Sequence, residues 1–131
     1  MKDQYFGDIN DYRKYGLLRA ISGAGDLNLM IAWMLTSDDG GMDGKFTSYL
    51  EYPDKWGHHD LELFQTIKKL LAGGRKRQVS LIEKTNLFEK VDYFSVLVPD
   101  AASDRSAWFN LLNQKSKKMI LFFLIRITDS K

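Results

Sequence analysis

The pattern of apolar and polar positions along the chain predicts alternating helices and strands. A continuous apolar run over residues 27–36, bounded by glycine and by the polar stretch SDDGG, is typical of a strand buried on both faces. Residues 90–99 alternate as a second strand that ends at Pro99, and residues 119–123 form a third apolar run. Because helical patterns separate these runs, we expect the strands to pair in parallel.

Three segments have the spacing of amphipathic helices. The first follows Asp8 or Asn10, either of which can cap it, and two glycines can end it. The second lies within residues 58–74, with His58 and His59 at its start and Asp60 in its first turn. It continues with an apolar stripe and has two late lysines before a glycine pair. The third has Ser103 or Asp104 as its candidate cap.

The order helix, strand, helix, strand, helix, strand predicts an α/β fold. The specific expectation is a Rossmann-like three-layer sandwich with a mostly parallel sheet, whose last strand lies at or near the centre. Residues 77–88 are equally compatible with a short helix and with a short strand followed by a turn. A length of 131 residues, with 44% hydrophobic and 27% charged residues, indicates a single domain over residues 1–131.

The amino-acid composition limits the kinds of site that the protein can contain. The chain has no cysteine, which excludes disulfides, thiolate zinc sites and a cysteine nucleophile. Its first residues lack the apolar core of a signal peptide and no apolar run reaches membrane-spanning length, so we expect a cytoplasmic protein without membrane contact. A net charge of +2 is too small to imply a nucleic-acid partner by itself.

In open parallel sheets, ligands bind beyond the carboxyl ends of the strands. The stretch after the first predicted strand supplies Asp38, Asp39 and Asp43 among glycines, and such carboxylates could bind Mg²⁺ or Mn²⁺. A solvated acidic turn is the alternative, which the spacing alone favours. No GxGxxG motif follows this strand, so the dinucleotide-binding fingerprint is missing. The adjacent His58 and His59 point in different directions on a helix and make a poor metal pair.

Basic side chains give two candidate contacts to phosphate or nucleic acid. The cluster that follows the second predicted helix is Arg75, Lys76 and Arg77. It could contact phosphates, or it could simply favour the dipole of the preceding helix. Arg105, near the start of the third helix, could bind a phosphate or carboxylate, or could pair with Asp104 or Glu83.

The first predicted helix has more charged and tyrosine side chains than are needed to cap it. Asp11, Tyr15 and Arg19 are spaced i, i+4 and i+8, with Lys14 beside them and Asp8 just before the helix. If this face lines a cleft, these five residues are the candidate catalytic residues. A surface helix with i,i+4 pairs is the equal alternative.

The same helix carries a family resemblance. The block YFGDINDYRKYGLLRAI, followed by IAWMLTSDDG, DGK, SYL and HDLELF, resembles an uncharacterised family of bacterial and phage proteins. The resemblance extends to about Lys118 and implies an architecture and a site location more than a reaction. Fuller members of that family continue from the third strand into an acidic loop of the type DLIFFDPDNGLE. Its carboxylates would face the ligand crevice and could bind a metal ion.

The chain departs from the family pattern after Lys118. Codons can be chosen for residues 119–131 so that the neighbouring reading frame translates as DLIFFDPDNGLE, and the codons of Lys117 and Lys118 form an A-rich run where one base is easily gained or lost. The hypothesis is a frameshift after about Lys118 that leaves the chain truncated relative to its family. A gene whose codons cannot encode Asp-Pro-Asp in that frame would end this hypothesis.

Three functions are compatible with these observations. The first is a shortened relative of a metal-assisted nucleic-acid or nucleotide-processing enzyme, such as a nuclease of phage or defence origin, with its activity lost or reduced. The second is a non-catalytic binding or assembly protein that forms a homo-oligomer through an exposed sheet. The third is a methyltransferase-like domain, which the missing glycine fingerprint disfavours.

Overall fold

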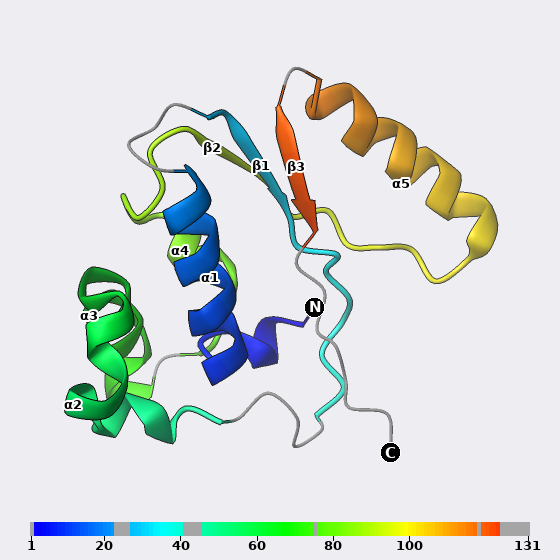
Figure 1. The fold of residues 1–131 in the computed structure, drawn as a ribbon. Coiled ribbons are helices and arrows are strands. Elements are labelled where there is room, and N and C mark those ends of the chain that lie inside the picture. Colours follow the sequence, from blue (N-terminus) through cyan, green and yellow to red (C-terminus); the bar gives the residue numbers. More distant parts are fainter. Residues whose placement is uncertain (1, 23–26, 41–45, 75, 118, 124–131) are drawn as a thin grey trace, which may run out of the picture.

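The computed structural model describes residues 2–22, 27–40, 46–74, 76–117 and 119–123. These residues form a mixed helix and strand fold around a small parallel sheet (Figure 1). The predictions for Asp43 and Arg75 lie outside the described residues, and so does the frameshift hypothesis for the segment after residue 123.

Three short strands form the sheet in the order β2-β1-β3. Strand β1 (Leu29–Ala32) pairs in parallel with β2 (Val91–Phe94) on one side and with β3 (Ile120–Phe123) on the other. Parallel pairing is therefore confirmed. In the described sheet β1 is the central strand and the last strand, β3, lies next to it at one edge, so the expected central position of the last strand is not found there. The expected extension of the second strand to Pro99 is wrong. The chain leaves the ladder after Phe94, and Val98 instead donates its N–H to the Leu35 carbonyl at 2.7 Å.

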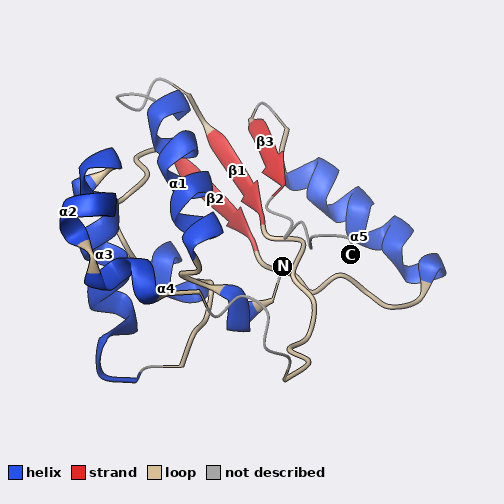
Figure 2. Ribbon diagram, turned by 60° about the horizontal axis from the view of Figure 1, so that its bottom comes forward, coloured by secondary structure: helices blue, strands red, loops and turns tan. Residues whose placement is uncertain are grey.

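One face of the sheet is covered by most of the helices. Helices α1 (Ile9–Ser22) and α3 (Leu61–Leu71) pack against each other, with α2 (Pro53–Trp56) and α4 (Ser80–Glu83) nearby (Figure 2). Leu29, Ile31 and Trp33 belong to the larger of two hydrophobic cores, together with side chains from these helices. Short 3-10 turns connect them: η1 (Asp3–Tyr5), η2 (Ser48–Glu51), η3 (Gly57–His59) and η4 (Ala72–Gly74).

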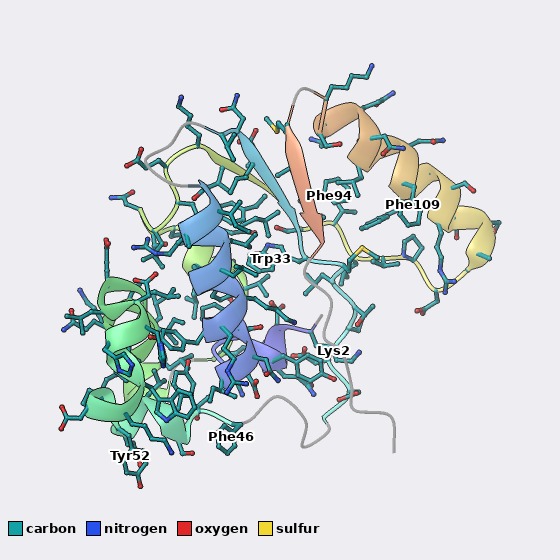
Figure 3. All side chains as sticks on the ribbon, viewed as in Figure 1. Lys2, Trp33, Phe46, Tyr52, Phe94 and Phe109 are labelled. Carbon is teal, nitrogen blue, oxygen red and sulfur yellow. The ribbon has the colours of Figure 1, made fainter. Side chains whose placement is uncertain are left out.

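The opposite face is covered by α5 (Ala102–Lys115) alone among the described helices. The smaller core joins Met30, Ala32 and Phe94 to Trp108 and Leu112 of this helix. Figure 3 shows Phe94 between the sheet and α5. Because alternate residues of β1 enter different cores, the strand is buried on both faces, as its continuous apolar sequence predicts.

Two helix starts differ in how they are capped. Asp60 caps α3, because its side chain accepts a hydrogen bond from the Leu63 N–H at 3.1 Å. The prediction that Ser103 or Asp104 caps α5 is wrong, since that helix begins after Ala101, which makes no side-chain cap bond. Residues 77–88, which the sequence leaves open, contain the short helix α4.

Within the described part of the chain, no helix is both long enough and apolar enough to cross a membrane.

Candidate functional site

The turn before α1 contains a buried polar network. Gly7 adopts φ +84°, and its N–H donates to Asp11 Oδ2 at 3.1 Å. The same oxygen accepts from the Tyr15 hydroxyl at 3.3 Å, while the Tyr49 hydroxyl donates to the Gly7 carbonyl at 2.9 Å. All four residues are buried. The predicted pairing of Asp11 with Tyr15 on one helix face is therefore present, but it lies in the protein interior.

Burial also changes the acidity of this network. It raises the pKa of Asp11 to about 7, although nearby Lys14 and the Gly7 N–H act in the opposite direction. Burial raises the pKa of Tyr15 well above its ordinary value, and the Asp11 carboxyl raises it further. Lys14 thus lies close enough to Asp11 to influence its proton.

Asp8 stabilises the start of α1 by accepting hydrogen bonds from two backbone N–H groups. Its Oδ1 accepts from the Asn10 N–H at 2.9 Å, and its Oδ2 accepts from the Phe46 N–H at 3.2 Å. The side chain is buried. Both predicted acids of this helix therefore have defined structural partners, and a catalytic role for either remains a prediction.

Arg19 lies away from Asp11 and joins α1 to α3. Its Nε donates to Asp60 Oδ2 at 2.7 Å and its Nη2 donates to Glu62 Oε2 at 2.9 Å, while Nη1 donates to the Leu87 carbonyl. Burial alone would lower the pKa of Arg19, but the two carboxylates raise it above its ordinary value. The guanidinium is thus occupied by contacts within the protein.

Asp38 and Asp39, the predicted cation ligands, both contact Gln4. Asp38 Oδ1 accepts from the Gln4 N–H at 3.1 Å, and Asp39 Oδ1 accepts from Gln4 Nε2 at 2.8 Å. Both acids are exposed. The described residues contain no group of three or more His, Cys, Asp or Glu side chains arranged to hold a metal ion. Binding of Mg²⁺ or Mn²⁺ by these two acids stays a prediction.

The predicted phosphate contacts do not form one surface. Arg77 donates from Nε to the Phe6 carbonyl at 2.6 Å, whereas Lys76 is exposed. Arg105 donates to the carbonyls of Pro99 and Asp100, at 2.9 and 2.7 Å, so it binds the loop that precedes its own helix. Within the described residues, Arg105 forms no ion pair with Asp104 or Glu83, the partners that the sequence suggested.

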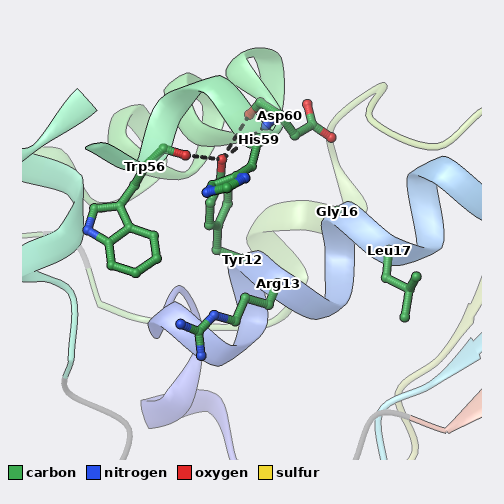
Figure 4. A pocket seen from close by; sticks show the side chains of 7 residues that line it. All are labelled: Tyr12, Arg13, Gly16, Leu17, Trp56, His59 and Asp60. Atoms are coloured by element: carbon green, nitrogen blue, oxygen red, sulfur yellow. Dashed lines mark hydrogen bonds between the residues drawn. The ribbon is translucent and has the colours of Figure 1, made fainter. Parts of the chain in front are cut away.

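A hollow that the sequence does not predict lies between α1 and the α2–η3 segment (Figure 4). Its volume is about 390 Å³, and its lining residues are Tyr12, Arg13, Gly16, Leu17, Trp56, His59 and Asp60. The Tyr12 hydroxyl fixes the two walls, because it donates to the Trp56 carbonyl at 2.7 Å and accepts from the Asp60 N–H at 3.1 Å. Figure 4 shows Trp56 and Arg13 toward one end of the hollow and Leu17 toward the other.

The side chains of Arg13 and Lys55 both lie close to the indole ring of Trp56. The Arg13 guanidinium carbon lies 5.6 Å from the ring centroid, and Lys55 Nζ lies 5.3 Å from it. Both basic side chains are exposed, and Trp56 is half-buried. Cations held near an aromatic ring at the edge of a hollow form a surface suited to an anionic ligand that also has an apolar or aromatic part.

A second hollow of about 400 Å³ continues from the first, because Gly16, His59 and Asp60 line both. It extends past Arg19 and Glu62 to Glu89. We name the two hollows together the α1 groove. One end of the α1 groove is cationic and aromatic, and the other end is polar.

The sequence does contain a signal for this groove. In PDKWGHH, a lysine directly precedes a tryptophan and two histidines follow, a combination of basic and aromatic side chains that is also found on phosphate-binding surfaces. Nothing in the sequence around Arg13 indicates that it belongs to the groove, because its guanidinium comes close to Trp56 only when α1 packs beside α2.

No protein-family model, curated protein or solved structure matches this chain. The family resemblance described above therefore remains a prediction, and the geometry of the α1 groove is the basis for a proposed function.

Proposed function

We propose that this protein binds a nucleotide or a nucleic-acid strand in the α1 groove, through a phosphate held at Arg13 and Lys55. The observation that carries this proposal is the pair of exposed cations on the Trp56 ring, at the edge of a hollow with aromatic and apolar walls. Arginine and lysine side chains supply the donors that phosphate requires. Tyr12 and Leu17 supply surface for a sugar or base.

Binding is tested by titration with a mononucleotide, followed by calorimetry and by tryptophan fluorescence. The chain has three tryptophans, of which Trp33 and Trp108 are buried, so quenching by iodide reports mainly on Trp56. A bound nucleotide is expected to protect Trp56 from iodide. Arg13→Ala is expected to weaken binding by about tenfold, because a lost charge-assisted hydrogen bond costs about 1.5 kcal/mol.

Arg105→Ala is the matched control, since it removes the same charge from α5 on the opposite face of the sheet. It is expected to leave affinity nearly unchanged, because that guanidinium binds backbone carbonyls. Equal loss in both variants would contradict a phosphate site in the α1 groove and would favour the carboxyl end of the sheet.

We propose a metal-assisted reaction on such a ligand as the second candidate function. The observation in its favour is that Asp38 and Asp39 follow the carboxyl end of the central strand and share Gln4 as a partner. Mg²⁺ or Mn²⁺ is expected to raise the Tm of the protein. The rise is expected to vanish in the Asp38→Asn/Asp39→Asn variant and to persist in Asp54→Asn/Asp104→Asn, which changes two exposed acids elsewhere. An equal rise in both variants would contradict this cation site.

We also propose that the fold is a Rossmann-like three-layer sandwich. Its support is a parallel sheet with separate hydrophobic cores on its two faces. In such folds the loops after the strands carry chemistry, whereas the α1 groove lies beside the helical layer. Binding in the groove and a reaction at the acids after β1 would therefore involve different parts of the molecule.

A further inference from the structure

Residues 2–4 lie against the loop that follows the central strand. Lys2 forms a parallel β-bridge with Thr36, and its Nζ donates to Thr36 Oγ1 at 3.0 Å and to the Ser37 carbonyl at 2.6 Å. Figure 3 shows Lys2 beside this stretch of the chain. In parallel sheets the loops beyond the carboxyl ends of the strands are where ligands bind. Residues 2–4 therefore occupy part of the edge at which a ligand would arrive.

Gln4 makes most of the contacts with this loop. Its backbone N–H donates to Asp38 Oδ1 at 3.1 Å, and its Nε2 donates to Asp39 Oδ1 at 2.8 Å. Its Oε1 accepts from the N–H groups of Asp39 and Gly40, at 3.1 and 3.3 Å. One residue thus binds both carboxylates of the candidate cation site and two backbone donors beside them.

The segment before α1 is held in two different ways. Residues 2–4 are half-buried, and most of their hydrogen bonds with the loop are exposed to water. Tyr5 and Phe6 are 5% and 0% exposed and belong to the larger hydrophobic core. Segments held by exposed polar contacts open at a lower free-energy cost than segments held by buried apolar ones. Residues 2–4 can therefore leave the loop while Tyr5 and Phe6 stay in the core.

A contact on a different part of the molecule reports on the same segment. Asp3 Oδ1 accepts from the Val79 N–H at 2.8 Å, just before α4. Asp3 stands between the two residues that bind the loop after β1. If residues 2–4 move together, the Val79 hydrogen bond breaks whenever the loop contacts break.

We propose that residues 2–4 are a strap that closes over the loop after β1 and opens as a unit, and that Mg²⁺ binds Asp38 and Asp39 only when the strap is open. This inference rests on the second candidate function and adds its regulation. In the closed strap, N–H donors of Gln4 point at both carboxylates, and the Lys2 ammonium binds the carbonyl of the residue before Asp38. This positive charge opposes a cation at the same place.

The first test measures amide hydrogen exchange by NMR on the full chain. Gln4→Ala removes three exposed hydrogen bonds with the loop and is expected to speed exchange of the Val79 N–H about fivefold. The Trp33 N–H, which donates to the Phe94 carbonyl, should keep its rate. Faster exchange confined to Asp39 and Gly40 would overturn a strap that opens as a unit.

The second test measures Mg²⁺ affinity of the same variants by calorimetry. A closed strap lowers the apparent affinity by the fraction of molecules that are open, so Gln4→Ala is expected to bind Mg²⁺ about fivefold more tightly than wild type. Gln65→Ala, at an exposed glutamine of α3, is the matched control and should change neither the affinity nor the exchange of Val79.

The outcomes separate the strap from the cation site. Equal Mg²⁺ affinity in wild type and Gln4→Ala, with faster Val79 exchange in the variant, would overturn control by the strap and leave the cation site standing. Absence of Mg²⁺ binding in both proteins would overturn the second candidate function and its regulation together. Joint opening of residues 2–4 is decided in every case by the Val79 exchange rate.

Discussion

At Asp11, burial and hydrogen bonding act on one carboxyl in opposite directions. Removal from water favours the neutral acid, whereas the Gly7 N–H and the charge of Lys14 favour the carboxylate. Burial is the larger effect and brings the pKa to about 7. Asp11 therefore changes its charge near neutral pH while it remains inside the turn that starts α1.

The stability of the fold is expected to depend on this proton. The pKa of Asp11 is about 7 in the folded state and 3.8 in a free chain, so the folded state binds more protons between these values. The resulting stabilisation is fully present below about pH 4 and is lost as the pH rises through about 7. Its size is about 4 kcal/mol, as three pKa units imply. Urea unfolding across this range measures it.

Asp11→Asn is expected to remove that part of the pH dependence, because an amide does not titrate in this range and can still accept from the Gly7 N–H. The informative quantity is the difference in unfolding free energy between wild type and variant at each pH. A difference that stays constant from about pH 4 to about pH 8 would contradict the raised pKa.

Gly7 is expected to resist substitution for two separate reasons. Its φ of +84° is unfavourable for a residue with a Cβ, and an added Cβ would lie 2.5 Å from Leu71 Cδ1. Gly7→Ala is therefore expected to lower the free energy of unfolding by about 2–4 kcal/mol. Gly73→Ala is the control, because Gly73 has a similar φ of +74° and no atom within 4 Å of an added Cβ. A loss as large at Gly73 would show that crowding by Leu71 is unimportant.

At the scale of elements, the first helical layer is joined by polar contacts over long sequence separations. Asp60 caps α3 through Oδ1 and binds Arg19 of α1 through Oδ2, a contact between residues 41 positions apart. Tyr12 makes a second link from α1 to the same segment. These links set the distance between α1 and the α2–η3 segment, and so they shape the α1 groove.

Variants of Asp60 are expected to separate its two roles. Asp60→Asn keeps an oxygen that can cap α3 but loses the charge that pairs with Arg19, and we expect it to cost about 1 kcal/mol. Asp60→Ala loses both and is expected to cost about 2 kcal/mol. Asp54→Ala, at an exposed acid in the first turn of α2, should cost under about 0.5 kcal/mol. Urea unfolding that finds equal losses in both Asp60 variants would contradict a separate cap contribution.

At the scale of the whole molecule, the two faces of the sheet are covered unequally. The larger core lies under several helices, whereas α5 contributes only Trp108 and Leu112 to the smaller core. Figure 3 shows Phe109 on α5 directed away from the larger core. The exposed apolar side chains on this side are Val96, Leu97, Phe109 and Leu111. Such a surface favours contact with another apolar surface.

The sequence analysis expects a homo-oligomer that forms through an exposed sheet. We propose instead that it forms through this side of the protein, by way of α5 and the segment after β2. Sedimentation velocity is expected to show association that increases with concentration. Leu97→Glu/Leu111→Glu should abolish it, because buried charges oppose association. Ile21→Glu changes a similarly exposed side chain on α1, on the other face of the sheet, and should have no effect. A wild-type protein that stays monomeric at all concentrations would contradict the proposal.

Much of the fold could be predicted because it depends on local patterns. A strand buried on both faces needs an apolar residue at every position, and residues 29–32 show this directly. The amphipathic run after Asp60 likewise indicates α3, although the sequence placed Asp60 in the first turn and the structure makes it the cap. The cap of α5 was predicted wrongly because several residues near position 103 have side chains that can cap a helix. In the structure the helix begins after Ala101, whose backbone is extended and whose side chain makes no cap hydrogen bond.

The sequence by itself determined the three long helices, the parallel pairing of the strands and the presence of acids, tyrosines and basic residues around α1. Only the tertiary structure decided which of these groups lie inside the protein and which line a groove. Asp11 and Tyr15 became interior partners, while Arg13 came to stand beside Trp56. The physical reason is that periodicity specifies the face of a helix, whereas the partner of that face comes from a distant segment brought close only by packing.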